Sequence, residues 1–242
     1  MKKDDKDIFK EFQDSLKNLD GTLHVLDASI PIEKQMEYFN YSDSVRKNME
    51  KGTVENQIII LNDDYSSTEE IQYALTFLAV SGDVKAYRAL EIYTEKNKDH
   101  LNDWAILAMM QARITLESEF SEEKQIFIST GLGGKDGNFR FYSFFKSNKL
   151  VPFSAYQKSL IEKEFPFFIE KSEGIIEEIK IEDNYFTLIF LINLQIDIRV
   201  VLRKVIDECN QYGNFIDTRF VITNVKIYSR EEIEKELLKD EE

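Results

Sequence analysis

Hydrophobic residues in the first half of the chain recur every three to four positions, which is the spacing of an amphipathic helix. Short polar joints separate the periodic stretches, and glycines at Gly21 and Gly52 close the first two of them. The expected helices are 7–19, 32–51, 54–61, 68–81, 84–95 and 101–120. The pattern therefore predicts a helical first half.

Two of these helix boundaries carry specific signals. Ser67 followed three positions later by Glu70 has the spacing of a capping box, which begins a helix by satisfying its first free N–H groups. The joint Ser81-Gly82-Asp83 is short enough to set two helices antiparallel. We expect Gly82 to end one helix there and Asp83 to cap the next.

The second half changes to shorter stretches rich in β-branched and aromatic residues, alternating with two long helical patterns. Strands are expected at 124–130, 138–146, 175–181, 185–194 and 218–228, and helices at 154–170 and 197–212. Pro166 is expected to break or kink the last turn of the first of these helices. The charged segment 230–242 is expected to be a terminal helix or a frayed tail.

The order β-β-α-β-β-α-β can be assigned to two folds. Its last six elements fit a ferredoxin-like sandwich with an additional leading strand. The whole order also fits two ββα units that form an antiparallel sheet covered by two helices, and we prefer this second assignment because a leading strand has no free edge beside the first strand of a ferredoxin-like sheet. The fold class is α+β in either case, with a helical region at 1–121 and an α+β domain at 122–242.

The helical region has a weak internal repeat. The alanine-rich runs 74–79 and 105–110 begin 31 residues apart, a period suited to stacked helical hairpins. The string ALTFLAVSGDVKAYRAL, at 74–90 of the chain, resembles the unit of two helices and a loop that builds HEAT-type α-solenoids. The resemblance implies a HEAT-like arrangement, and a plain helical bundle remains the alternative.

Composition narrows the classes of partner. The formal net charge is −14, so a phosphate backbone is repelled unless the basic residues gather on one face, and no basic block does this. The longest apolar run, 186–194, is too short for a membrane helix, and the charged start lacks the apolar core of a signal peptide. We therefore expect a cytoplasmic protein with a protein partner and with neither nucleic acid nor membrane as a partner, and its oligomeric state stays open.

The most distinctive stretch is 125–147, which we interpret as a β-hairpin connected by a glycine cluster. Four of the nine glycines lie within seven residues there. The cluster departs from phosphate-binding loops, because Gly134-Lys135-Asp136 leads into a strand and not into a helix. A hairpin tip is the simpler interpretation. The alternative is an anion-binding loop, whose candidate residues are Gly131, Gly133, Gly134, Lys135 and Arg140.

The strand after this loop carries aromatic residues on both faces, since Phe139, Phe141 and Phe145 alternate with Tyr142 and Phe144. It resembles the aromatic RNP1 strand of RNA-recognition domains, but Arg140 stands where that motif has a small residue, and the strand precedes the first helix of its domain. With one face on the covering helices, the other is expected to meet the helical half or a partner. The candidate interaction residues are Tyr142, Phe144 and Trp104.

No arrangement of residues in the sequence identifies a catalytic centre. Cys209 is the only cysteine and lies on the apolar stripe of its helix, and His24 and His100 are the only histidines. We expect no catalytic residues, no metal site and no cofactor. The leading hypothesis is a cytoplasmic protein-interaction or regulatory module without catalytic activity. The alternatives are a small-molecule or phosphate-binding protein or enzyme that uses the loop at 131–137, and an acidic immunity-type protein that binds a basic partner.

Overall fold

The computed structural model describes residues 21–49, 52–96, 100–121, 123–128 and 130–238. These residues form two compact units, 21–128 and 130–238. The helix expected at 7–19 lies outside the described residues.

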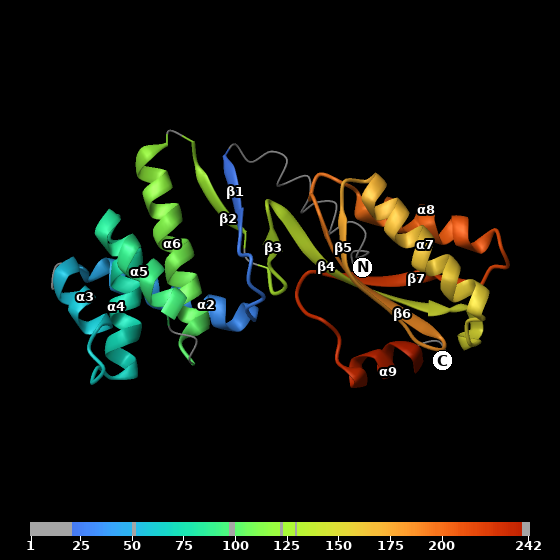
Figure 1. Cartoon of the computed structure of the whole chain (residues 1–242), viewed down its shortest axis with the longest axis horizontal. Coiled ribbons are helices and arrows are strands. Elements are labelled where there is room, and N and C mark those ends of the chain that lie inside the picture. The colour runs from blue at the N-terminus through green and yellow to red at the C-terminus, as the bar shows by residue number, and fades with distance from the viewer. Residues whose placement is uncertain (1–20, 50–51, 97–99, 122, 129, 239–242) are drawn as a thin grey trace, which may run out of the picture. The chain divides into compact units, whose positions relative to one another are not determined.

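The first unit is mostly helical (Figure 1). Its elements are β1 (Thr22–Val25), α2 (Ile32–Lys47), α3 (Val54–Leu61), α4 (Thr68–Val80), α5 (Val84–Lys96), α6 (Asn102–Phe120) and β2 (Gln125–Ile128). Helix α4 begins at the expected capping box of Ser67 and Glu70 and ends at Val80, and Gly82, whose φ is +68°, follows the C-cap residue Ser81. These local signals placed the helix ends to within a few residues.

The core of this unit lies where α4, α5 and α6 pack together. The alanine-rich faces of α4 and α6 are fully buried, so small side chains allow these helices to approach closely. A polar group completes the core at α2, where the Tyr38 hydroxyl donates to Gln111 Oε1 at 2.6 Å and the Ser42 hydroxyl donates to the same oxygen at 2.9 Å. This network satisfies the hydroxyls of Tyr38 and Ser42, which α2 buries.

The hairpin expected over 125–147 is wrong. Strand β2 pairs in parallel with β1, with Thr22 opposite Gln125 and Val25 opposite Ile128. The ring of Phe127 packs against Phe39 of α2, with centroids 5.4 Å apart. The short run around His24 is thus a strand that the sequence pattern did not reveal. A parallel pair joins distant segments, so no local turn announces it.

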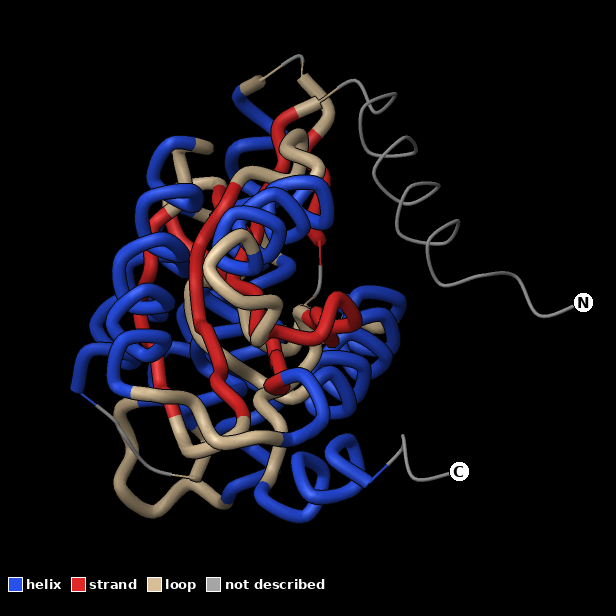
Figure 2. The backbone as a smooth tube through the Cα atoms, turned by 90° about the vertical axis from the view of Figure 1, so that its right-hand side faces the viewer, coloured by secondary structure: helices blue, strands red, loops and turns tan. Residues whose placement is uncertain are grey.

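The second unit is an antiparallel sheet with helices on both faces. Its elements are β3 (Gly134–Lys135), β4 (Asn138–Ser147), the 3₁₀ turn η2 (Asn148–Leu150), α7 (Ala155–Lys171), β5 (Ile175–Ile181), β6 (Tyr185–Ile192), α8 (Ile198–Asn210), β7 (Ile216–Thr223) and α9 (Arg230–Leu238). Figure 2 distinguishes the helices and strands of the chain by colour. Pro166 lies inside α7, which continues to Lys171. The expected break at this proline does not occur.

The sheet has the strand order β5-β6-β4-β7, and the short β3 pairs with the start of β4. With the helices included, the order along the chain is β4-α7-β5-β6-α8-β7, which is the ferredoxin-like sandwich. The duplicated ββα arrangement that we preferred from the sequence is therefore wrong. The objection to the ferredoxin-like order does not apply, because β2 belongs to the other unit and needs no place in this sheet.

The inner face of the sheet packs against α7 and α8. Phe145 of β4 stacks on Phe186 of β6 with centroids 4.6 Å apart, and Phe165 of α7 meets both rings edge to face. Helix α8 buries the stripe that its sequence periodicity predicts, including Cys209. This aromatic core fixes which side chains of β4 and β6 point to the opposite face.

The outer face of the sheet is covered in part by α9 (Figure 1). Tyr142 and Phe144 form a buried cluster there with Leu132, and Ile233 and Leu237 of α9 pack against it. The terminal segment is therefore a docked helix over 230–238. None of the helices in the described ranges is both long and apolar enough to cross a membrane.

Candidate functional site

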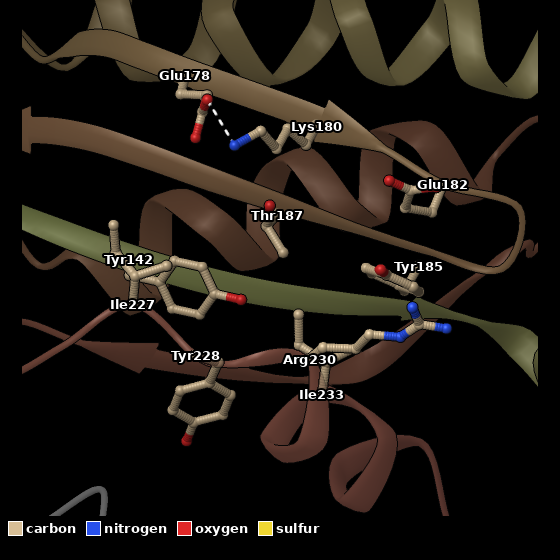
Figure 3. Close-up of a pocket in the computed structure, with 10 residues that line it drawn as sticks. All are labelled: Tyr142, Glu178, Lys180, Glu182, Tyr185, Thr187, Ile227, Tyr228, Arg230 and Ile233. Atoms are coloured by element: carbon tan, nitrogen blue, oxygen red, sulfur yellow. Dashed lines mark ion pairs between the residues drawn. The ribbon is translucent and has the colours of Figure 1, made fainter.

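A pocket of about 520 Å³ opens in the second unit between the outer face of the sheet and the segment that leads into α9 (Figure 3). Its size falls in the range of small-molecule sites. The residues that line it are Tyr142, Glu178, Lys180, Glu182, Tyr185, Thr187, Ile227, Tyr228, Arg230 and Ile233.

Strand alternation places the floor of this pocket. On β6, Phe186 points into the inner core, so its neighbours Tyr185 and Thr187 point to the outer face. On β4, Phe141 and Tyr142 divide in the same way. The floor is therefore as fixed as the aromatic core beneath it.

The connection from β7 to α9 forms one wall. The hydroxyl of Ser229 accepts a bond from the Glu232 amide at 3.3 Å, and the Glu232 carboxylate accepts one from the Ser229 amide at 3.0 Å, so the two form a capping box. Lys226 pairs with the same carboxylate. The bond from Lys226 and the bond from the Ser229 amide both lower the pKa of Glu232. The connection also sets the Tyr228 ring 5.4 Å from the Tyr142 ring.

The Tyr142 hydroxyl is the most unusual polar group of the site. The side chain is 2% exposed, and the hydroxyl makes no hydrogen bond with any described residue. Figure 3 shows it pointing into the pocket. Burial raises the pKa of Tyr142 far above the ordinary phenol value, so the group is a neutral phenol that can both donate and accept. A buried hydroxyl without a partner costs about 1–3 kcal/mol, which a bound polar group would recover.

Charges of both signs surround the mouth. Lys180 pairs with Glu178 at 2.8 Å on β5, and Arg230 pairs with Glu234 at 3.1 Å on α9. Glu182 follows β5 and is exposed. Burial is the largest cause that raises the pKa of Tyr185, and the negative charge of Glu182 adds to it while Arg230 opposes it. Both charges therefore act on the same phenol at one end of the pocket.

The glycine cluster lies elsewhere in the second unit. Residues 131–134 are buried, and the Leu132 amide donates to the Asn224 carbonyl at 3.0 Å. A Cβ at Gly131 would come within 1.8 Å of the Val225 carbonyl oxygen, so this glycine permits a close approach of two backbones. The hairpin between β3 and β4 turns at Asp136 and Gly137, which both have positive φ, as in a type I′ turn.

Protein acceptors hold the Arg140 side chain, and its backbone amide donates to the Gly133 carbonyl at 3.0 Å. Its Nε and Nη2 donate to the Glu177 carboxylate at 2.5 and 2.9 Å, and its Nη1 donates to the Leu132 carbonyl at 2.7 Å. Lys135 is exposed on β3, and Gly133 and Gly134 precede it in the buried segment. These candidate ligand residues are near neighbours in the sequence. In the structure, the Arg140 guanidinium is directed at Glu177.

Two of the three candidate interaction residues lie together in the second unit, and the third lies in the first unit. Tyr142 and Phe144 are 2% and 3% exposed under α9. Trp104 belongs to the other unit, where its Nε1 donates to Thr76 Oγ1 at 3.0 Å and its ring packs against Tyr38 and Tyr41. Of the sequence candidates, Tyr142 alone lines the pocket.

The remaining candidates for chemistry are spread over both units. Burial raises the pKa of the Cys209 thiol to about 12, so the sulfur stays protonated. In the helical unit, His24 Nε2 lies 2.6 Å from Gln125 Oε1, and His100 Nε2 lies 3.4 Å from Thr68 Oγ1. Among the residues that the structure describes, no three His, Cys, Asp or Glu side chains are arranged to hold a metal ion.

Sequence reasoning missed most of the pocket because α9 was read as a charged end. A signal was present, since Ile233 and Leu237 stand four positions apart among charged residues, the spacing of one helix face. Ile227 and Tyr228 precede them. An apolar face in a charged helix indicates that the helix docks, although the surface that receives it cannot be read from the spacing.

Comparison with solved structures shows a partial likeness. No protein-family model matches the chain, and no curated protein matches it. A solved structure of a REP-associated tyrosine transposase bound to a REP hairpin is similar with a TM-score of 0.32 and 12% identity, over 45% of this chain and 64% of that chain. This chain therefore spans less than two thirds of that protein.

The likeness corrects one expectation. The net charge led us to expect a protein partner and to exclude nucleic acid, but the similar structure holds a DNA hairpin. A likeness of this size assigns no partner to this chain.

Proposed function

We propose that this protein is a cytoplasmic regulatory module without catalytic activity, which binds a small molecule in the pocket between the sheet and α9. The observation that carries the proposal is the buried Tyr142 hydroxyl, which points into a cavity of about 520 Å³ and has no partner among the described residues. Buried polar groups almost always have a partner, and a ligand would supply it.

The surroundings of the hydroxyl support binding. Tyrosine rings and isoleucines line the pocket together with the hydroxyls of Tyr142 and Thr187, and charged side chains lie at its mouth, so a small ligand would meet both apolar and polar groups. The floor lies on paired strands whose inner faces form the aromatic core, so binding needs no large rearrangement there.

Thermal unfolding of the full chain with a metabolite panel tests the proposal. A ligand present at a hundred times its dissociation constant stabilises the folded state by about 2.7 kcal/mol, enough to raise the melting temperature by several degrees. Tyr142→Phe should lose that response, because it removes only the hydroxyl. Without ligand the same variant should be at least as stable as the wild type, because the unpartnered group is gone.

Tyr156→Phe is the matched control, since Tyr156 lies on α7 and is 60% exposed. This variant should respond to the panel as the wild type does. The proposal is wrong if no compound stabilises the wild type, or if Tyr142→Phe responds to the same compounds by the same amount.

A further inference from the structure

The two ends of the Tyr142 pocket differ in chemistry. At one end, Glu182 from the sheet and Arg230 from the start of α9 both lie near Tyr185 (Figure 3). At the other end, the Tyr142 hydroxyl is buried, and Thr187 of β6, which lies opposite Phe144, also lines the pocket. A ligand that fills the pocket therefore meets a pair of opposite charges at one end and a hydrogen-bonding hydroxyl at the other.

We propose that the ligand is a free α-amino acid in its zwitterionic form, with a side chain that ends in a hydrogen-bonding group. This inference rests on the proposed function. The ligand carboxylate pairs with the Arg230 guanidinium, its ammonium pairs with the Glu182 carboxylate, and its side chain reaches the Tyr142 hydroxyl. An α-amino acid carries its two charges on one carbon, which matches a site where an acid and a base from different elements face the same ring.

The ion pairs at the mouth of the pocket allow Arg230 and Glu182 to pair with a ligand. The side chains of Arg230 and Glu234 are 92% and 58% exposed, and an exposed pair of this kind adds little stability. A ligand carboxylate can therefore replace Glu234 at small cost. Glu182 forms no ion pair within the described ranges, so its carboxylate is available to an ammonium group.

Purely anionic ligands fit the pocket less well. Glu178 and Glu182 both line it, and Lys180 is already paired with Glu178. In this pocket a phosphate group would meet two carboxylates as well as two cations, and the protein as a whole has a net charge of −14, so its attraction would be weak. A zwitterion gains from charges of both signs.

Calorimetric titration of the full chain tests the inference. The twenty standard amino acids are titrated first. If L-tyrosine binds, for example, tyramine lacks the carboxylate and 3-(4-hydroxyphenyl)propionate lacks the ammonium group. Each analogue should bind the wild type roughly tenfold more weakly or worse, because each loses one charge-assisted hydrogen bond.

Two exposed substitutions then assign the charges. Arg230→Gln should bind tyramine as tightly as it binds L-tyrosine, but it should still bind the propionate more weakly. Glu182→Gln should bind the propionate as tightly as it binds L-tyrosine, but it should still bind tyramine more weakly. Arg219→Gln, on β7 and 68% exposed at its side chain, should keep both penalties. Circular dichroism confirms that each variant is folded.

The outcomes separate the two proposals. If no amino acid binds but nucleosides or sugar phosphates bind and require the Tyr142 hydroxyl, the inference falls and the proposed function stands. Amino-acid binding whose penalties are unchanged in both variants also overturns the inference. If no compound of any class binds, both proposals fall.

Discussion

The guanidinium of Arg140 joins three segments of the second unit. It donates to Glu177 on β5 through two nitrogens and to the Leu132 carbonyl through a third, while its own backbone lies on β4. Glu177 can reach it because the register between β5 and β6 shifts between Ile176 and Glu178. The bulge in β5 therefore directs the Glu177 side chain across β6 toward Arg140 on β4.

Acid should weaken this bond and the unit with it. The hydrogen bond from Arg140 is the main reason that the pKa of Glu177 lies below its ordinary value. A carboxyl whose pKa is lowered by folding adds stability above its unfolded pKa, and that stability is lost as the pH falls through the folded pKa. When the pH falls from 7 to 3, the free energy of unfolding should therefore decrease in both proteins, and the decrease should be about 1 kcal/mol smaller in Glu177→Gln than in the wild type.

Urea unfolding at a series of pH values measures this difference. Glu162→Gln is the control, because Glu162 is exposed on α7, and it should keep the pH dependence of the wild type. Parallel curves for Glu177→Gln and the wild type would show that the bond contributes nothing to stability.

The sequence predicted the features of single residues that depend on their near neighbours in the chain, and it did not predict the others. Alternation along β4 correctly separated Tyr142 and Phe144 from Phe141 and Phe145. Alternation gives the face on which a side chain lies, but it does not give what covers that face. The unpartnered state of the Tyr142 hydroxyl depends on every group around it, so no pattern in the sequence reveals it.

At the scale of elements, helices were easier to place than strand pairings. Helix ends follow from caps and glycines within a few residues, as at Ser67 and Gly82. The partner of β2 lies about a hundred residues earlier in the chain, at β1. Assigning β2 to the wrong hairpin also led us to prefer the wrong strand order.

Helix α9 should detach when its apolar face is made polar. Ile233 packs against the cluster of Tyr142 and Phe144, so Ile233→Asp places a charge on an apolar surface and should cost about 2 kcal/mol of stability in the docked helix. Trypsin should then cut faster after Lys226 and Arg230. The measurement is the rate of appearance of these fragments by mass spectrometry.

Leu238→Asp is the matched control, since Leu238 lies on the same helix and is 59% exposed. Its cleavage rate should stay close to that of the wild type. Equal rates in all three proteins would mean that the contacts of Ile233 do not hold the helix.

At the scale of the molecule, each unit has its own hydrophobic core. The helical unit buries alanine and leucine faces around α4, and the second unit buries a phenylalanine cluster between its sheet and α7 and α8. A separate core is what allows a domain to fold alone. The sequence patterning changes from helical to strand-rich at 122, and β2 (Gln125–Ile128), which follows that point, belongs to the helical unit.

Residues 130–242 expressed alone should therefore fold. The fragment should give dispersed amide signals by nuclear magnetic resonance and a cooperative thermal transition. Ile206→Asp, which buries a charge beneath the sheet, should abolish both. A wild-type fragment with collapsed signals would show that the second unit needs the first.

The bulge at Glu177 also bears on how the chain behaves in crowded solution. Strand β5 ends the order of the second unit's sheet, and an edge strand offers unpaired backbone groups to any other chain that can extend it. Glu177 interrupts the regular ladder there, and the charged Glu178 and Lys180 follow it. An incoming strand thus meets an irregular, charged margin, which protects the protein against edge-to-edge aggregation.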